Sequence, residues 1–560
     1  MTHMLYSLGL VVLGLCWLVS EHFPPWYAFH TEVPAFAAVF IGLVVPIRHR
    51  LSSFKIPSGV AGVVLLLAVV GVQWASGLMV YGGDAWVAVA YVAVFGLAWL
   101  WAYHWVHVGS KQIVLLAICY CLICIALVTS LQLFAQWLQV DQWFDGWVLE
   151  RLPQGRPRAN LGQPNQAATT LVMAMVAAGA LFAHQRINYG VACLLVVVFT
   201  LAATLTQSRT ALLSATVVAV GFLAYARGRK LGLCANVSVI IWLAIFMSTA
   251  WVFANQDLVV GAPSLNQEQI TQIGTRPLIW RQLCLAVLEK PWFGWGVLQL
   301  AGAQQWGGTN FPGTEQANYA HNILLDSLVM LGIPITIAIL GAILWWVCRR
   351  WKHLHSSAEG MWSVALLMPI IVHAMLEYPH AYSYYLVLAG LLIGLVDAST
   401  LGTEEQAFEV SRGVMLCITV TWLALLLLLG REYMLAEEDF RMNRFENRRI
   451  GPPQMDYQPP RLLFLTQLSD QARAMRLRAV RDMPPEDVDT LDRVAKRYTW
   501  GPIQFRAALA LALNGRPDEA SNRLRVIKSL FAEDVYAEAR DNFLRLADEQ
   551  YPELKLVTVP

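Results

Sequence analysis

The chain has 560 residues, of which 57% are hydrophobic and only 14% carry a charged side chain. Soluble domains usually carry about 25% charged residues, so this composition cannot cover a globular surface with polar groups. The formal net charge of +2 argues against a nucleic-acid partner, because such binding depends on neutralising many phosphates. We therefore expect a protein for which lipid is the main solvent.

Charged residues are distributed unevenly along the chain. Residues 431–560 hold 21 basic and 21 acidic side chains, 42 of the 78 charged residues in the sequence. This contrast predicts a membrane domain over 1–430 and a soluble domain over 431–560.

Apolar runs long enough to approach the thickness of a bilayer recur throughout the first domain. They predict about thirteen spans, at roughly 5–20, 34–47, 57–76, 85–103, 112–138, 166–183, 188–206, 210–226, 234–253, 322–347, 361–376, 382–396 and 413–430.

The basic residues between these spans alternate between the two sides of the membrane. One set of loops is rich in Lys and Arg, and the short loops of the other set contain almost none, so the rich set is expected to be cytoplasmic. The N-terminus is then cytoplasmic, and an odd number of spans places residues 431–560 outside. The rich set contains Arg48, Arg50, Lys55, Lys111, Arg186, Arg227, Arg229, Lys230, Arg349, Arg350, Lys352 and Arg412.

Two of the outside loops are long, at about 139–164 and 254–320. Loops of this length are usually functional or disordered. The second loop is rich in Trp, Gly, Gln and Pro rather than in runs of charge. We expect it to be folded.

The C-terminal domain has the pattern of a helical hairpin over 502–531. Apolar residues recur at helical spacing, Asn514 and Gly515 predict a stop, and Pro517 with Asp518 predicts the next helix start. The hairpin resembles one tetratricopeptide unit, although a solenoid needs about three. The predicted fold class is therefore all-α: a polytopic helix bundle with a helical, TPR-like C-terminal domain.

Four arginines on the outside break the charge rule for orientation: Arg156, Arg158, Arg209 and Arg276. An arginine at the centre of a bilayer costs about 2.5–3.5 kcal/mol on insertion scales, and less near the interface. A phosphate or diphosphate held at the outer surface would offset this cost, because it matches the planar guanidinium group. The alternative is that each arginine is structural, with its guanidinium in the interface or bonded to carbonyl groups.

The segment NYAHNILLDSLVMLGIPI (318–335) places His321 and Asn322 where the second long loop enters a span. A histidine there can accept a proton near neutral pH. The alternative is a histidine that caps the helix or is solvated by water. His373 and Glu377 lie one helical turn apart, next to Tyr378, and Glu377 either orients a polar group or is a buried structural ion.

The sequence gives little sign of a cofactor. The first outside loop, EHFPPWYAFHTE (21–32), contains two His and two Glu residues, but their spacing matches no reliable zinc pattern. A Walker loop, GxGxxG, GxSxG and HExxH are all absent from the sequence. We predict no metal and no cofactor, so the energy for any reaction must come from an activated substrate.

The elements HNILLDSLVMLGI, QSRT and TRPLIW…KPWFGWG resemble the Wzy/WaaL superfamily of polyprenyl-diphosphate glycan ligases and polymerases. Within it, EHFPPWYAFHTE, RPRANLGQPNQ and HAMLEYP resemble the PglL-type protein O-oligosaccharyltransferases. The resemblance covers most of 1–430. It implies the GT-C fold class, metal independence and a bacterial inner-membrane protein whose active site and C-terminal domain are periplasmic.

The resemblance also implies roles for individual residues. His321 corresponds to the essential histidine, and Arg209 and Arg276 correspond to the arginines that engage the lipid diphosphate. Further matched positions have less defined roles in catalysis (Glu377, Tyr378) or substrate binding (Arg158, Gln163, Asn165, Asn322). The implied partners are an undecaprenyl-diphosphate-linked glycan, a pilin-like acceptor protein and membrane lipid.

Two other functions remain open at this point. An O-antigen ligase or Wzy-type polymerase would share the chemistry but transfer the glycan to lipid A core or to another glycan. A lipid or glycan transporter would use the outside arginines as a substrate vestibule, and it predicts charges deep within spans and internal repeats.

Overall fold

A computed structural model describes most of the chain: residues 2–48, 53–152, 155–228, 233–254, 274–313, 315–400, 406–450 and 457–560. Arg50, Arg229 and Lys230, which entered the orientation prediction, lie outside these ranges. Residues 255–273 of the second long loop also lie outside them.

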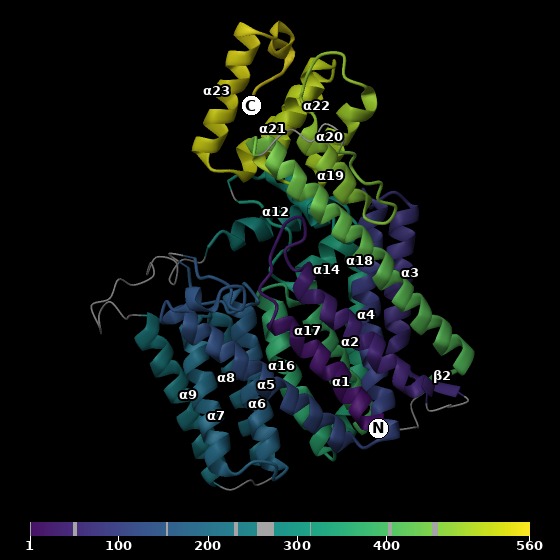
Figure 1. The fold of residues 1–560 in the computed structure, drawn as a ribbon, viewed down its shortest axis with the longest axis vertical. Coiled ribbons are helices and arrows are strands. Elements are labelled where there is room, and N and C mark those ends of the chain that lie inside the picture. Colours follow the sequence, from purple (N-terminus) through teal and green to yellow (C-terminus); the bar gives the residue numbers. More distant parts are fainter. Residues whose placement is uncertain are drawn as a thin grey trace. The chain divides into compact units, whose positions relative to one another are not determined.

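The described chain is almost entirely helical (Figure 1) and divides into two compact units. Unit 1 comprises Met1–Val64, Tyr91–Gln272 and Ala342–Leu426, and unit 2 comprises Leu65–Ala90, Ile273–Gly341 and Leu427–Pro560.

Unit 1 is built mainly from apolar helices. They are α1 (Thr2–Gly14), α2 (Phe29–Arg48), α5 (Lys111–Trp137), α6 (Pro164–Ala183), α7 (Tyr189–Leu205), α8 (Arg209–Gly228), α9 (Leu233–Ala254), α16 (Ala358–Leu376) and α17 (Ser383–Thr400). Four further helices contribute residues to both units: α3 (Val60–Ala75), α4 (Gly82–Val108), α15 (Ile333–Leu354) and α18 (Arg412–Arg448).

Unit 2 joins the second long loop to the C-terminal domain. Its loop helices are α12 (Arg276–Glu289), α13 (Leu300–Asn310) and α14 (Ile323–Leu331), and its C-terminal helices are α19 (Thr466–Arg476), α20 (Pro485–Arg497), α21 (Gly501–Leu513), α22 (Pro517–Leu530) and α23 (Glu533–Glu549). The expectation that the second loop is folded is confirmed for its described part.

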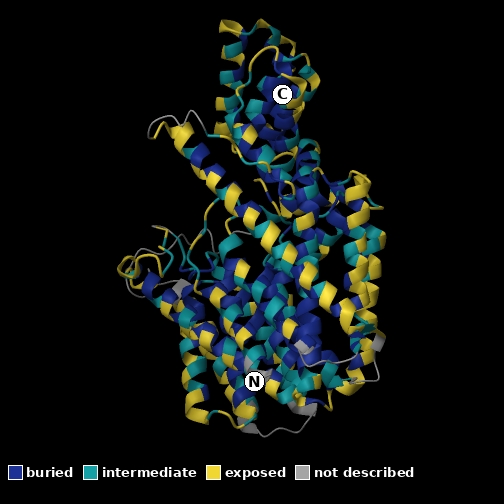
Figure 2. Cartoon of the chain, turned by 45° about the vertical axis from the view of Figure 1, so that its right-hand side comes forward, coloured by how far each residue is buried: buried dark blue, intermediate teal, exposed yellow. Residues whose placement is uncertain are grey.

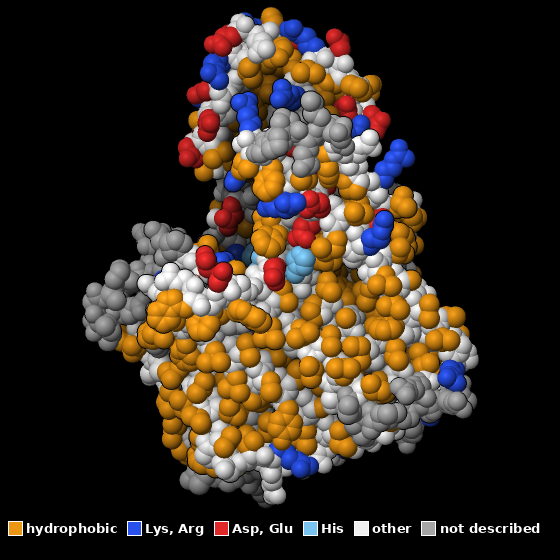
Figure 3. Space-filling model, in the orientation of Figure 1, with side chains coloured by type: hydrophobic (Ala, Val, Ile, Leu, Met, Phe, Trp, Pro, Cys, Tyr) orange, Lys and Arg blue, Asp and Glu red, His pale blue; other side chains and the backbone are white. Residues whose placement is uncertain are grey.

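Seven helices in the described part of the chain are long and apolar enough to cross a membrane. They are α4, α5, α6, α15, α16, α17 and α18, and several shorter apolar helices accompany them. In Figure 2, the parts of the helices that face inward are coloured mostly as buried residues and the parts that face outward mostly as exposed residues. On the face drawn in Figure 3, hydrophobic side chains cover the helical bundle of unit 1, as expected for a surface in lipid.

Each predicted span coincides with a helix, but the prediction of one continuous span over 322–347 is wrong. Gly332 has φ +81° and separates α14 from α15. The tract KPWFGWG packs against this break: the Ile333 N–H donates to the Pro291 carbonyl at 2.7 Å, and the Trp295 N–H donates to Val329 at 2.8 Å. A Cβ on Gly332 would meet the Trp292 backbone at 2.7 Å, so glycine is required by both the space and the backbone angle.

Two other features depart from the predicted pattern of membrane helices and short loops. Helix α18 continues well beyond the predicted end of its span and runs to Arg448. A two-stranded antiparallel sheet pairs β1 (Ser53–Pro57) with β2 (Gln406–Ser411), which are far apart in the sequence. The hydropathy pattern does not report such a distant pairing.

Unit 1 contains a buried ion pair between Arg350 and Asp397, whose side chains are 2% and 3% exposed. The indole N–H groups of Trp99 and Trp346 donate to the same carboxylate at 2.7 and 3.0 Å. The loop pattern of the sequence predicts Arg350 to be a loop charge, whereas the structure places it inside the packed helices. Only a partner distant in sequence could reveal this.

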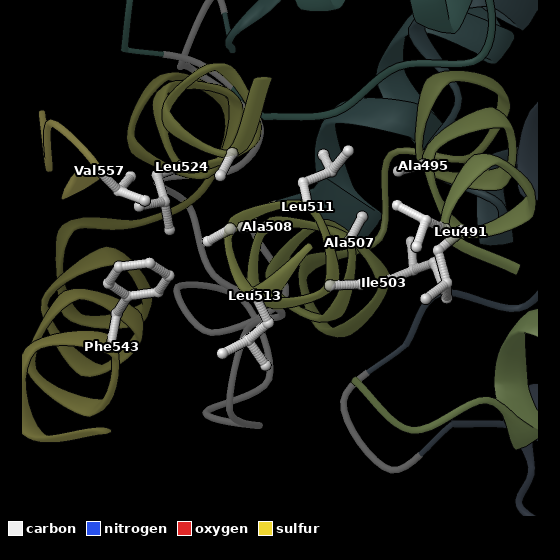
Figure 4. Close-up of a cluster of buried hydrophobic side chains, with 14 of the residues drawn as sticks. Leu491, Ala495, Ile503, Ala507, Ala508, Leu511, Leu513, Leu524, Phe543 and Val557 are labelled. Carbon is white, nitrogen blue, oxygen red and sulfur yellow. The ribbon is translucent and has the colours of Figure 1, made fainter. Parts of the chain in front are cut away.

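The C-terminal helices of unit 2 have a core of their own (Figure 4). Helix α21 contributes Ile503 and Ala507 toward Leu491 of α20, and Ala508 toward the helices that carry Leu524 and Phe543. The hairpin predicted over 502–531 is present as α21 and α22, and Gly515 at φ +81° makes the turn between them. The likeness to a tetratricopeptide unit stays a prediction.

Replacing Arg350 by Met would leave the Asp397 carboxylate as a buried charge without its cation. We expect a loss of about 3–5 kcal/mol, because breaking a buried pair leaves an uncompensated charge. The matched control is Arg349→Met, since Arg349 is exposed on the same helix and lies over the Trp345 ring; it should cost about 1 kcal/mol or less. Thermal unfolding of the purified protein in detergent measures both, and equal losses would contradict the expectation.

Candidate functional site

The residues predicted from the sequence fall into two groups, one in each unit. Unit 1 contains Arg158, Gln163, Asn165, Arg209, Glu377 and Tyr378, and unit 2 contains Arg276, His321 and Asn322.

The centre of the first group is the side-chain amide of Asn165, which is 8% exposed. Its Nδ2 donates to Oε1 of Glu377 at 3.1 Å, and its Oδ1 accepts from the Ser208 hydroxyl at 2.7 Å. Glu377 is 4% exposed and Ser208 is equally buried. One amide therefore connects a buried carboxylate to the residue that precedes Arg209.

Three helix ends bring these side chains together. Asn165 lies in the first turn of α6, where Gln163 is the N-cap and accepts from the Gln166 N–H at 2.8 Å. Glu377 is the C-cap of α16, and Arg209 begins α8. Helix ends are favourable places for such groups, because the first backbone N–H groups and the last backbone C=O groups of a helix have no partner within the helix.

Arg156 joins this group, and it carries a second charge beside Arg209. Its Nη1 donates to the Gln207 carbonyl at 3.1 Å, and Gln207 has a left-handed φ of 49°. Burial lowers the pKa of Arg156, the Glu377 carboxylate raises it, and Arg209 lowers it further. Arg209 itself is exposed. Two guanidinium groups and one carboxylate thus share a single electrostatic environment, with an excess of positive charge.

Arg158, in contrast, is tied into the first long loop. Its Nη2 donates to the Glu150 carbonyl at 3.2 Å, and its backbone N–H donates to Oε1 of Gln136 at 2.8 Å. Burial lowers the pKa of this guanidinium as well. The structure gives Arg158 a role in closing the loop, whereas Arg156 is the residue coupled to Arg209.

His373 and Tyr378 flank Glu377 but have different surroundings. The Nδ1 atom of His373 lies 3.0 Å from the Thr169 hydroxyl, so this histidine links α16 to α6. Tyr378 is partly exposed and its ring stacks on that of Tyr382, with centroids 6.1 Å apart.

In unit 2, His321 adopts a left-handed backbone conformation with φ 55°, which is uncommon for a residue with a side chain. The residue before it is held at both of its backbone polar groups: the Ala320 carbonyl accepts from the Trp280 indole at 2.7 Å, and the Ala320 N–H donates to Asp326 at 2.7 Å. After it, Asn322 caps α14 by accepting from two backbone N–H groups. Strain of this kind persists only where the surroundings fix the backbone.

Arg276 begins α12, the helix whose Trp280 holds the segment before His321. The Thr275 hydroxyl donates to the Glu315 carboxylate, which joins the start of α12 to the same segment. Ile279 and Leu283 of α12 form an apolar core with Ala317 and Ala320. Arg276 and His321 are therefore carried by two elements that pack together.

The segment 21–32, which contains two His and two Glu residues, forms structural contacts. The ring nitrogens of His22 lie 3.0 and 2.7 Å from the carbonyl oxygens of Tyr27 and Asn160. The Glu32 carboxylate, 1% exposed, accepts from the Tyr91 hydroxyl and from the Ser383 N–H. Within the described residues no three His, Cys, Asp or Glu side chains gather in a group that could hold a metal ion.

The sequence predicts no role for Ser208, and the residues predicted from the resemblance to bind substrate do not include Arg156. The motif QSRT contains Ser208 beside Arg209, so the signal was present, but the partner of Ser208 lies 43 residues away on α6. Such a contact cannot be read from spacing along the chain.

Three family descriptions match separate parts of the chain. Residues 157–182 match a protein glycosylation ligase family, residues 193–340 match the O-antigen ligase family, and residues 361–544 match the C-terminal part of a virulence factor membrane-bound polymerase. These ranges contain Asn165, His321 and Glu377 respectively.

Two relatives come from Acinetobacter baylyi. A general O-oligosaccharyltransferase is 27% identical over 95% of this chain and 94% of its own length. A ComP-specific O-oligosaccharyltransferase is 22% identical over 68% of this chain and 70% of its own length. The chain is therefore similar to the O-antigen ligase family and, over almost its whole length, to protein O-oligosaccharyltransferases, and it is an enzyme of the glycosyltransferase type.

Proposed function

We propose that this enzyme transfers an oligosaccharide en bloc from an undecaprenyl-diphosphate carrier to Ser or Thr of a periplasmic protein such as a type IV pilin. The observation that carries the proposal is the alignment, over almost the whole of both chains, with a relative named general O-oligosaccharyltransferase. The buried Asn165 network and the strained His321 segment supply groups suited to this chemistry.

The arginines act on the diphosphate. Arg156, Arg209 and Arg276 donate charge-assisted hydrogen bonds to its oxygens and stabilise the negative charge that grows as the diphosphate leaves. The carboxylate of Glu377, held by Asn165, limits the repulsion between Arg156 and Arg209 before substrate binds. Arg158, Gln163 and Asn322 contribute by fixing the backbone around these groups.

His321 acts on the acceptor. Its imidazole takes the proton of the Ser or Thr hydroxyl while the hydroxyl oxygen forms a bond to the anomeric carbon. The bond between that carbon and the diphosphate oxygen breaks in the same step, and its electron pair leaves with the diphosphate. One direct displacement inverts the anomeric centre. Glu377 and Tyr378 orient sugar hydroxyl groups.

The topology completes the proposal. About thirteen spans of a GT-C bundle cross the bacterial inner membrane, the N-terminus is cytoplasmic, and the active site and the TPR-like C-terminal domain face the periplasm. The charge pattern of the loops supports this orientation, and the apolar helices support the location in a membrane.

A second candidate function is an O-antigen ligase or polymerase, which the match of residues 193–340 favours. Coexpression with a candidate pilin and a defined lipid-linked glycan separates the two. Intact mass measurement shows a glycan on the protein in the first case, and modified lipid A core or a longer glycan in the second. A transporter, the third possibility, would move the lipid-linked glycan across liposome membranes without breaking its diphosphate bond.

We expect His321→Ala to abolish glycan transfer, because the attacking hydroxyl then has no base, while the protein stays folded in the membrane. Transfer by the purified enzyme is measured by the mass of the acceptor. His355→Ala is the control, since His355 is exposed beyond the end of α15. Wild-type turnover in the His321 variant would remove this residue from the mechanism.

Arg156→Ala should lower kcat/KM for the lipid-linked donor roughly ten- to a hundredfold, since a hydrogen bond to a charged group contributes about 1.5–3 kcal/mol. The assay varies donor concentration at saturating acceptor. Arg186→Ala, an exposed arginine after α6, should leave the constant unchanged. An Arg156 variant as active as the control would show that Arg209 and Arg276 bind the diphosphate without it.

Removal of divalent cations should leave the rate unchanged, because guanidinium groups supply the positive charge that metal ions provide in many diphosphate sites. The measurement is initial transfer rate before and after dialysis of the purified enzyme against EDTA. A loss that added Mg²⁺ or Mn²⁺ restores would contradict metal independence.

A further inference from the structure

Helix α13 carries two adjacent buried glutamines, Gln304 and Gln305, whose side chains bond to different parts of unit 2. Adjacent residues of an α-helix project about 100° apart, because one turn takes about 3.6 residues. The two amides therefore connect α13 to two separate neighbours.

Gln304 holds the segment that leads to His321. Its Nε2 donates to the Glu315 carbonyl at 2.8 Å, and its Oε1 accepts from the Ala317 N–H at 2.7 Å. Gln282 of α12 stands beside it, 3.3 Å from the same amide, and donates to the Phe311 carbonyl at 2.8 Å. Both glutamines are fully buried, so these contacts fix the path of the chain a few residues before the histidine.

Gln305 holds the C-terminal domain. Its Nε2 donates to the Ala495 carbonyl at 2.9 Å and to the Thr499 hydroxyl at 3.0 Å, and its Oε1 accepts from Nη1 of Arg523 at 2.9 Å. Arg523 is 9% exposed and lies 3.5 Å from the Asp492 carboxylate, so its position is fixed within the domain.

The two ends of α13 are attached to the same domain. At its start, the N-cap residue Gln299 donates to Asp84 at 3.0 Å, and Arg497 of α20 pairs with both oxygens of that carboxylate at 2.8 and 3.0 Å. After its end, the Gly313 N–H donates to the Ser529 carbonyl at 3.0 Å.

From these contacts we infer that the C-terminal domain positions His321 through α13, with Gln305 and Arg523 as its main connection and Gln304 as the contact to the catalytic segment. Gln305 and Arg523 are positioning residues, because neither touches the histidine. The inference rests on the proposed function for the role of His321. A left-handed backbone needs continuous support from its surroundings, and the domain provides it.

The test is Gln305→Ala in the full-length protein, which removes the connection and leaves the pair of Arg523 and Asp492 intact. We expect kcat for transfer to fall roughly ten- to a hundredfold, since small misplacements of catalytic groups have effects of this size, while KM for the acceptor protein changes less than about twofold. Hydrogen exchange should become faster in residues 315–322 and stay unchanged in α21.

Asn310→Ala is the matched control, because Asn310 is an exposed carboxamide on the same helix whose Nδ2 donates to the Trp306 carbonyl, also in α13. It should match the wild type in both measurements. If Gln305→Ala does not fold, Arg523→Met breaks the same connection from the other side and is read in the same way, with the exposed Arg525→Met as its control.

Three results would overturn the inference: an unchanged kcat, a rise in acceptor KM alone, which indicates that the domain docks the acceptor, or a lower kcat without faster exchange in 315–322. Failure of the proposed function is distinguishable, because the wild type would then transfer no glycan to protein. Exchange in the Gln305 variant would still report whether the domain supports the segment.

Discussion

Buried Asn and Gln side chains supply the hydrogen-bond partners of backbone groups that lie between the helices of this protein. A chain surrounded by lipid must satisfy its backbone N–H and C=O groups internally, and helices do so without help. Between helices another partner is needed, and an amide side chain offers a donor and an acceptor together. Gln136 accepts from the N–H groups of Arg158 and Ala159 and donates to Leu149, and Gln73 bonds in the same way to the tract around Phe293 and Met330.

Glu377, Arg209 and His321 lie close to such amide contacts. Asn165 connects Glu377 to the residue before Arg209, and Gln304 holds the segment before His321. Left-handed backbone recurs at the same places, at Ala159, Gln207 and His321. The same amide hydrogen bonds that satisfy the backbone of the irregular loops also fix the positions of charged and titratable side chains. A displacement reaction requires such fixed positions.

The two units differ in their content of charged residues and are stabilised differently. Unit 1 contains few charges, and the ion pair of Arg350 and Asp397 is satisfied by two indole donors. Unit 2 includes a domain rich in charged residues, and its contacts to α13 use a carboxylate, a guanidinium and an amide. A domain of this kind can hold a loop in place because both atoms of the Gln305 amide and both oxygens of the Asp84 carboxylate are hydrogen-bonded in the contact.

The sequence by itself determined that this is a largely helical membrane protein and that its motifs resemble those of protein O-oligosaccharyltransferases. Hydropathy and charge are properties of local composition, and short motifs such as QSRT and HNILLDSL can be recognised without knowledge of the fold. It also singled out His321, Arg209, Asn165 and Glu377 as candidates, although their roles stay predictions.

Only the tertiary structure decided how those residues are held. The break at Gly332 depends on the backbone of Trp292, the burial of Arg350 depends on Asp397, and the coupling of Arg156 to Arg209 and Glu377 depends on the meeting of helix ends. Each involves residues that are far apart along the chain or whose contact is set by packing. Composition and spacing do not reveal such contacts. The contacts depend on which helices pack together, and helices with similar apolar patterns do not specify their packing partners.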